Sequence, residues 1–394
     1  MTVFLERLHV RDFGPFRDVC FDLRQKRGYP FGEDLVAENG AGEGFIRAGL
    51  LCGRNGAGKS FLGRALIDIA GQVFMPSPDE AGGNPVVSAD ADLDDEFNKR
   101  CARLAFVFSI EGCRAAYTYA RTDDGICLAE RFTVDDETVF EVNHPARRLR
   151  LSRDPRWNLE TLQTERFLDG EIPLLRFVTA NTLLAPENPL RQVRDFVRGM
   201  LLVRATDEGL HVQGPGAKAC RDPEAFVVRN GLLQDLEGFL QDLGIDETLV
   251  ARESCGRTEI CFRHRNADLS VRRAASGGTL RLIELFALMK RLEHSGRSES
   301  SGPASLIFLD DLTDGLHPQI SRSIWRQLLE TAAGQILLTV HGTALLSNRF
   351  VRPDAVWIVT RDRVAVMPEL TTREIREGND LAKLLLGGAF GEVV

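Results

Sequence analysis

A glycine-rich stretch that ends in a lysine and a serine is the part of the chain best suited to chemistry. It reads LCGRNGAGKSFLG over residues 51–63 and has the spacing typical of loops that bind nucleotide phosphates. Glycines allow positive φ angles, so successive backbone N–H groups can point at phosphate oxygens, while Lys59 reaches the β- and γ-phosphates and Ser60 binds Mg²⁺. The residues predicted to hold ATP here are Gly53, Asn55, Gly56, Gly58, Lys59 and Ser60.

The flanks of this stretch decide between a phosphate loop and a glycine turn that carries Lys-Ser by chance. An apolar run, IRAGLLC, precedes the turn and predicts a buried strand, and FLGRALIDIA follows it and predicts a helix. A helix that starts at the turn directs its positive end toward a bound anion. This strand-turn-helix setting favours the phosphate loop.

Two adjacent carboxylates are suited to the other side of a Mg–triphosphate site. In SLIFLDDL, an apolar run from Leu306 to Leu309 leads directly into Asp310 and Asp311. We expect Asp310 to hold Mg²⁺ through water and Asp311 to position or activate the attacking water. The alternative is an acidic pair that simply ends a strand, and the phosphate loop in the same chain weighs against it.

Two further stretches have residues suited to phosphate recognition. Ser276, Gly277 and Gly278 open a long amphipathic helix, whose N-terminus would offer free backbone N–H groups and a hydroxyl to an anion. His341 follows the apolar run QILLTV, at a strand end where the ligands of parallel sheets usually bind. Each has an ordinary alternative, since Ser-Gly-Gly is a common helix cap and a lone histidine is often structural. Their order along the chain, relative to the phosphate loop and the acidic pair, favours a role in phosphate recognition.

The rest of the chain supplies the elements that must position these residues. Alternating apolar and polar residues on both sides of residues 12–15 predict two strands joined by a turn, and similar alternation over 102–142 predicts an antiparallel meander. Residues 158–250 show helical spacing, and the last third alternates strand with helix, which implies a mostly parallel sheet covered by helices. The predicted class is α/β with a mixed or parallel sheet, an antiparallel β subdomain and an inserted helical region.

The chain divides into three predicted parts. Residues 1–150 form an N-terminal ATPase lobe with the phosphate loop and the meander, residues 151–250 a helical insertion, and residues 251–394 a C-terminal lobe with the acidic pair and His341. Residues 76–98 are polar, acidic and rich in proline and glycine, so we expect a loop or a partly disordered segment there.

In this order the motifs resemble the RecF/SMC-like branch of the ABC-type ATPases. The stretches that carry the resemblance are the phosphate loop, ASGGTLRLIELFALMK, FLDDLTDGLHPQ, Thr339-Val340-His341, RPDAVWIVTRD and LLLGGAFGEVV. They look most like the stand-alone bacterial ATPases of this branch, many of which belong to anti-phage defence systems. The resemblance covers roughly residues 1–75, 100–130 and 240–394, and it implies an ABC-type P-loop ATPase head.

The resemblance also implies a composite site between two copies of the chain. One copy would contribute residues 53–60, Asp310, Asp311 and His341, and its partner would offer Ser276, Gly277 and Gly278 to the γ-phosphate. The cofactors implied are ATP and Mg²⁺, and the partner implied is the chain itself, as an ATP-dependent dimer or higher homo-oligomer. His341 would sense the γ-phosphate, and Asp314 would communicate across the dimer.

Two positions depart from the family pattern. Relatives usually have glutamate where this chain has Asp311, whose side chain is one methylene shorter; displacing a general base by about 1 Å lowers its efficiency, so we expect slow hydrolysis or a need for a partner. Many relatives also place a glutamine on Mg²⁺, and Gln72 is only a weak candidate for that role.

Composition limits the partners and the location. The net charge of −8 argues against a surface built for constitutive nucleic-acid binding, although arginines gather at residues 147–156 and 263–273 and leave DNA or RNA open as a partner. The eight cysteines show no C-x-x-C pair, which favours reduced thiols over a zinc site. No apolar run approaches the ~20 residues of a membrane span, and the N-terminus lacks an export signal. We therefore predict a cytoplasmic protein without a membrane partner.

The leading prediction is an ATP-hydrolysing, dimerising switch, the ATPase or sensor component of a bacterial anti-phage defence system that controls a separate effector protein. Two alternatives stay open. The first is a nucleotide-binding scaffold with weak catalysis, which the aspartate at position 311 favours. The second is an ATPase that binds or repairs DNA, for which the arginine groups are the only signal; we find no added nuclease motif.

Overall fold

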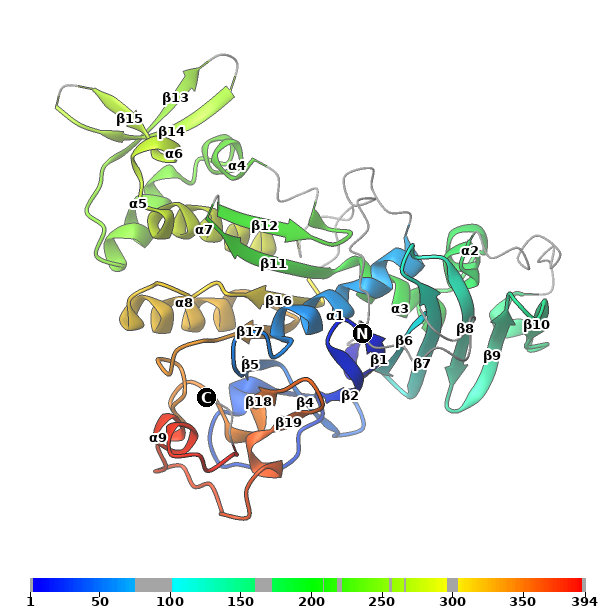
Figure 1. Ribbon diagram of the computed structural model, residues 1–394. Coiled ribbons are helices and arrows are strands. Elements are labelled where there is room, and N and C mark those ends of the chain that lie inside the picture. The colour runs from blue at the N-terminus through cyan, green and yellow to red at the C-terminus, as the bar shows by residue number, and fades with distance from the viewer. Residues whose placement is uncertain are drawn as a thin grey trace.

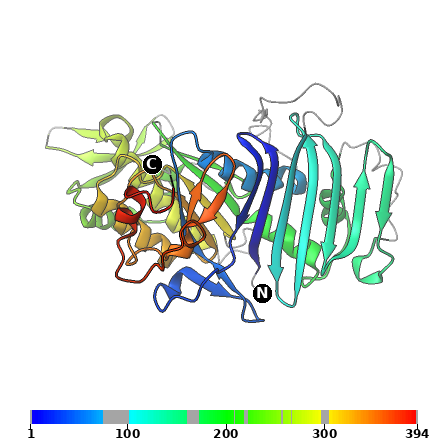
Figure 2. The ribbon, with the colours of Figure 1, turned by 60° about the horizontal axis from the view of Figure 1, so that its bottom comes forward.

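Two seven-stranded sheets form the framework of the protein in its computed structural model (Figure 1). The structure describes residues 3–74, 101–159, 172–207, 209–217, 222–254, 257–265, 267–295 and 304–391. One sheet is antiparallel, with strand order β10-β9-β8-β7-β6-β1-β2, and the other is mixed, with order β12-β11-β16-β17-β5-β18-β19. Figure 2 shows the long strands of the antiparallel sheet side by side at one end of the molecule.

The antiparallel sheet confirms the predicted turn and meander. Its side chains alternate between buried and more exposed positions, as in β7, because one face packs against the core. Its strands are β1 (Phe4–Phe13), β2 (Phe16–Asp22), β6 (Cys101–Ile110), β7 (Cys113–Thr122), β8 (Cys127–Val134), β9 (Glu137–Asn143) and β10 (Arg148–Leu151).

The mixed sheet confirms the predicted parallel core. Strands β11, β16, β17, β5 and β18 run parallel, and β12 and β19 pair antiparallel at the two edges. Parallel strands end at the same edge of a sheet, so the residues that follow β5, β16 and β17 are brought together there. The strands are β5 (Ala48–Cys52), β11 (Met200–Thr206), β12 (Gly209–Gln213), β16 (Leu306–Asp310), β17 (Gln335–Thr339), β18 (Val356–Val359) and β19 (Val364–Val366).

Helices cover the mixed sheet, and α1 contacts β11 and β16 of that sheet as well as β1 of the antiparallel one. The α-helices are α1 (Lys59–Val73), α2 (Leu174–Asn181), α3 (Pro189–Arg198), α4 (Pro223–Arg229), α5 (Leu233–Asp242), α6 (Val271–Ala274), α7 (Gly277–Ser295), α8 (Pro318–Thr331) and α9 (Leu381–Leu386). Small strands complete the fold: β3 (Val36–Glu38), β4 (Gly44–Ile46), β13 (Leu249–Ser254), β14 (Arg257–Arg263) and β15 (Asp268–Ser270). No helix in the described ranges combines the length and the apolar character that crossing a bilayer requires.

The middle of the chain differs from the predicted helical spacing at one important place. The stretch LRQVRDFVRGMLL is not one helix: α3 ends at Arg198, and Met200 begins β11, which pairs with β16 inside the mixed sheet. A short apolar run has the same appearance in a buried helix and in a buried strand, so periodicity alone could not separate them. The three-part domain division stays a prediction. The loop predicted at 76–98 and most of the linker at 295–303 lie outside the described residues.

A buried carboxylate joins the antiparallel sheet to α2. Glu130 of β8, 2% exposed, accepts hydrogen bonds from the backbone N–H groups of Leu174 and Leu175 and from the Tyr117 hydroxyl. It therefore caps the positive end of α2. Cys127 and His144 place possible metal-ligating atoms within 4.8 Å of this carboxylate, but its three hydrogen bonds already account for Glu130 as a structural group.

This carboxylate should give the stability of the protein a recognisable pH dependence. Burial raises the pKa of Glu130 from 4.5 to about 6, so the folded chain holds the proton more tightly than the unfolded chain between these values. The free energy of unfolding should therefore fall by about 2 kcal/mol as pH rises from about 3.5 to about 7, relative to a Glu130→Gln variant. Denaturant titrations of both chains across this range measure the difference, and an equal pH dependence in the two would contradict it.

Candidate nucleotide-binding site

The glycines of the phosphate loop stand where larger residues would clash. Gly58 caps α1 with a φ of 110°, and a Cβ atom there would lie 2.6 Å from the Phe16 ring. At Gly53 a Cβ would lie 2.4 Å from the backbone oxygen of Val359. The loop therefore packs against its neighbours by backbone alone, while Asn55 and Gly56, at its tip, are exposed.

Lys59 is enclosed at the start of α1. It is 5% exposed, and its ammonium donates to the backbone oxygens of Gly53 (2.7 Å) and Arg54 (3.3 Å). Burial lowers its pKa, and the carboxylates of Asp311 and Asp310 oppose this shift. A phosphate beside the ammonium would favour its charged form in the same way.

Asp310 joins the elements that meet at the edge of the mixed sheet. It is fully buried at the end of β16, and its Oδ1 accepts hydrogen bonds from Ser60 at 3.1 Å and from Thr339 at 3.1 Å. Its Oδ2 accepts one from Arg204 at 3.1 Å. Ser60 and Asp310 are 250 residues apart in sequence, yet their side chains touch, as the motif order predicts.

Asp311 and His341 form a second pair beside this one. The ring Nε2 of His341 lies 2.8 Å from Oδ1 of Asp311, and both side chains are about one-third exposed, at 30% and 36%. Asp311 has a φ of 57°, a left-handed conformation that aspartate tolerates better than most residues, and its N–H donates to the Thr339 hydroxyl at 2.8 Å. The turn holds this carboxylate toward solvent, next to the buried one.

The sequence analysis gave no role to two members of this group. Arg204 lies opposite Asp310 in the β11–β16 pairing, and its Nη2 is buried without a hydrogen-bond partner among the described residues. Thr339 uses one hydroxyl to contact both Asp310 and Asp311, the latter at 3.3 Å. The sequence signal for Thr339 was its place at the end of QILLT. Arg204 gave no sequence signal, because the helical prediction for this region hid the strand β11 that carries it.

Ser276, Gly277 and Gly278 lie apart from this group. The Ser276 hydroxyl stays within its own turn, accepting from the N–H of Thr279 at 3.1 Å, and no hydrogen bond between described residues joins these three residues to the phosphate loop. Their helix instead touches the turn after β16, since Arg281 donates to the backbone oxygen of Asp314 at 2.9 Å. One copy of the chain thus presents these residues separately from its own phosphate loop.

Gln72 is wrong as a magnesium ligand. It lies in the last turn of α1, twelve residues after Ser60, and a helix rises 1.5 Å per residue, so about 18 Å separate the two along the axis. Its side chain is buried beside the helix end rather than at the strand edge.

The residues at this edge fit a Mg–triphosphate. The glycine loop leaves the backbone of a helix N-terminus free to face an anion, and Lys59 adds a buried ammonium. Ser60 and Asp310 supply the hydroxyl and carboxylate oxygens that Mg²⁺ prefers, and the unpartnered Nη2 of Arg204 is a further donor beside them.

Comparison with known protein families identifies the family of the chain. Residues 50–347 match the family model described as "AAA domain, putative AbiEii toxin, Type IV TA system". The chain belongs to this family. The AAA domain assignment confirms the predicted class of P-loop ATPase, and the matched residues run from the end of β5 to the segment after His341.

The fold is also similar to solved structures of low sequence identity. The recombination mediator RecF of the RecFOR pathway, in its RecF-ATPrS form, is 14% identical over 93% of this chain and 98% of that one, with a TM-score of 0.42. An SMC head bound to the C-winged helix domain of ScpA is 12% identical over 92% and 97%, with a TM-score of 0.45. No curated protein sequence matches the chain.

Proposed function

We propose that the protein binds Mg–ATP at the edge of the mixed sheet and hydrolyses it between two copies of the chain. The observation that supports this most is the contact between Ser60 and Asp310, with the buried Lys59 beside them. In this proposal the loop residues Gly53, Asn55, Gly56, Gly58, Lys59 and Ser60 hold the triphosphate. Bound Mg²⁺ would neutralise charge on the β- and γ-phosphates.

The chain's own residues would handle the water and its proton. Asp311 would accept a hydrogen bond from the attacking water, since its carboxylate is exposed at the strand edge rather than tied to Asp310. His341, 2.8 Å from Asp311, would hold that carboxylate in place and meet the γ-phosphate. Arg204 would orient Asp310 through the contact on its Oδ2.

The partner copy would complete the site with Ser276, Gly277 and Gly278. The exposure of Ser276 and Gly277, and the fact that the hydrogen bonds of Ser276 remain within its own turn, support a role in trans. Arg281 links this helix to the turn at Asp314. Dimer closure at one ATP site could therefore change the position of the turn beside the other ATP site. ATP would then hold two copies together, and hydrolysis would release them.

Size-exclusion chromatography with light scattering tests the dimer. With Mg²⁺ and a slowly hydrolysed ATP analogue, the mass of the wild-type particle should double, because the γ-phosphate bridges two copies. Ser276→Arg should keep nucleotide affinity within about twofold but prevent the doubling, since a bulky side chain blocks the interface. The matched control is Thr372→Arg, an exposed position outside the site. The proposal would be contradicted if the mass of the wild-type particle did not change with the analogue, or if the mass of the Ser276→Arg particle still doubled.

Control of a separate effector in an anti-phage defence system is the physiological role we infer from the resemblance. Co-purification from the source cells, with and without the ATP analogue, tests it. A scaffold with weak turnover is the second candidate, supported by the shorter side chain at Asp311. The DNA-binding alternative has less support, because Arg156 pairs with Asp154 and Arg272 pairs with Glu224, which reduces the free positive charge of both arginine groups.

A further inference from the structure

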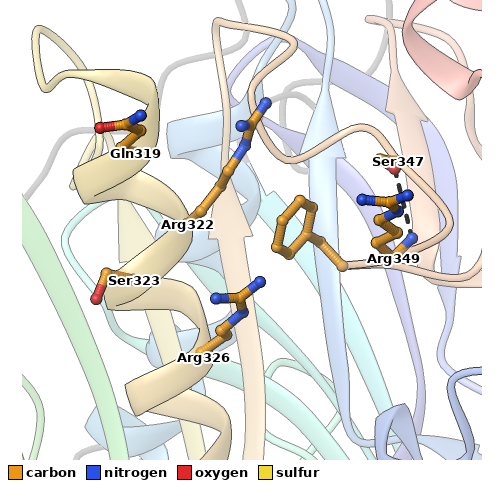
Figure 3. A pocket seen from close by; sticks show the side chains of 7 residues that line it. Gln319, Arg322, Ser323, Arg326, Ser347 and Arg349 are labelled. Carbon is orange, nitrogen blue, oxygen red and sulfur yellow. Dashed lines mark hydrogen bonds between the residues drawn. The ribbon is translucent and has the colours of Figure 1, made fainter.

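Three arginines line one cavity beside α8, and none of its lining residues belongs to the phosphate loop. Arg322 and Arg326 reach from the helix toward the segment that carries Ser347 and Arg349 (Figure 3). The cavity has a volume of about 460 Å³. Its other lining residues are Gln319, Ser323 and Phe350.

The side chains that line this cavity carry positive charge and no negative charge. In the part of the chain that the structure describes, no carboxylate lies within ion-pair distance of Arg322, Arg326 or Arg349. Elsewhere arginines do find such partners, as Arg352 does with Asp354 at 3.0 Å. Three like charges in one concavity repel each other, and this is unusual in a chain of net charge −8. A bound anion would relieve the repulsion.

Local contacts hold the arginines in place. The guanidinium groups of Arg322 and Arg326 lie against the Phe350 ring, at 5.5 Å and 5.2 Å from its centroid. Arg322 also donates through Nε to the backbone oxygen of Ala344 at 3.0 Å, which leaves its terminal N–H groups for a ligand. The donors are therefore partly ordered before anything binds, which lowers the entropy cost of binding.

The chemistry of the lining matches a phosphate ester. Guanidinium forks bind phosphate oxygens in pairs, and the hydroxyl of Ser347 on the facing segment is a further donor. The volume lies within the range of roughly 300–1,000 Å³ found for small-molecule sites. A single nucleotide or a free phosphate would fit such a space.

The surroundings argue against an extended nucleic acid strand. A larger cavity adjoins this one and shares Arg322, Ser347 and Arg349, but its lining also includes the carboxylates of Asp314, Glu377 and Asp380. Successive phosphates of a strand would meet these carboxylates, whereas a compact anion would not. We propose that the arginine cavity binds a small phosphate ester of nucleotide size, at a site distinct from the phosphate loop.

Occupancy of this cavity would act on the segment that follows His341. Arg322 donates to the backbone oxygen of Ala344, and Trp325 donates to the backbone oxygen of Phe350 at 2.8 Å, so two hydrogen bonds already join α8 to the segment. A phosphate bound by Arg322 and Arg349 would add a third link between the helix and this segment. His341, which contacts Asp311, lies at the start of the segment. The cavity is thus placed to influence the ATP site without being part of it.

Calorimetric titration of the full-length chain tests the binding. The wild-type protein is titrated without other nucleotide, with AMP and, separately, with inorganic phosphate as probes of the arginine cavity. We expect one site per chain, weakened at least tenfold in Arg326→Glu and in Arg349→Glu. Arg229→Glu, an exposed arginine at the end of α4, is the matched control and should bind as the wild type does. The same titration in a Lys59→Ala background keeps the result independent of the proposed ATP site.

Each further outcome is decisive. Tighter binding of AMP than of phosphate assigns the site to nucleotides, and equal binding assigns it to the phosphate group alone; both support the proposal. No heat with either probe at low ionic strength, or equal binding by wild type and Arg326→Glu, overturns it. A single-stranded oligonucleotide that binds tighter than AMP, and loses that affinity in Arg326→Glu, would also overturn it by assigning the cavity to a nucleic acid strand.

Discussion

Replacing Lys59 with alanine will weaken the binding of ATP and ADP by at least about 100-fold, or roughly 3 kcal/mol. The Lys59 ammonium is enclosed at the start of α1, and its acceptors are the loop oxygens of Gly53 and Arg54. When a triphosphate is bound, the ammonium exchanges those neutral acceptors for charged ones in a site shielded from solvent, where charge-assisted hydrogen bonds are strongest. Titration of a fluorescent ATP analogue measures the loss.

The control for this variant is Lys383→Ala, which removes a lysine whose side chain is 85% exposed on α9. It should bind nucleotide as the wild type does. Lys59→Arg adds a second comparison: it keeps the charge but places a larger, planar group in a close-packed position, so we expect most of the affinity to be lost there too. If Lys59→Ala has the nucleotide affinity and the melting temperature of the wild type, Lys59 does not bind the nucleotide and the proposed site is wrong.

The parts of this site that the sequence predicted are those in which local pattern and chemistry coincide. The phosphate loop needs a strand before it and a helix after it, and both appear as apolar runs of the right length. Asp310 and Asp311 follow an apolar run that can only be buried, so their place at a strand end was predictable. Their meeting with Ser60 followed from the rule that parallel strands end at one edge.

The parts that the sequence did not predict depend on contacts between distant strands. Arg204 is defined by its register opposite Asp310, which no local pattern in LLVRAT reveals. The Thr339 hydroxyl bridges two carboxylates, yet threonine at a strand end is common. The error at Gln72 was of another kind, because the helix rise alone places it too far from Ser60. Periodicity gives the elements, but pairing order decides which side chains meet.

Asp311→Asn should lower the rate of phosphate release by at least about 100-fold while leaving nucleotide affinity within about twofold. Asparagine has the same size and tolerates the left-handed φ of 57° equally well, so the backbone should not change. What it loses is the negative charge that lets Asp311 accept a proton from water and hold the ring of His341 at 2.8 Å. Single-turnover and steady-state phosphate release separate chemistry from binding.

Asp311→Glu, measured alongside, separates a slow enzyme from a scaffold. Glutamate reaches about one methylene farther toward the water, so turnover should rise severalfold if reach limits the rate. Glutamate adopts a positive φ less readily than aspartate, so the free energy of unfolding of the same variant should be lower by about 1 kcal/mol. A faster and less stable variant would mean that the turn after β16 balances catalytic reach against backbone strain. If neither wild type nor Asp311→Glu releases phosphate although both bind ATP, the site holds nucleotide without consuming it, and the scaffold is the correct function.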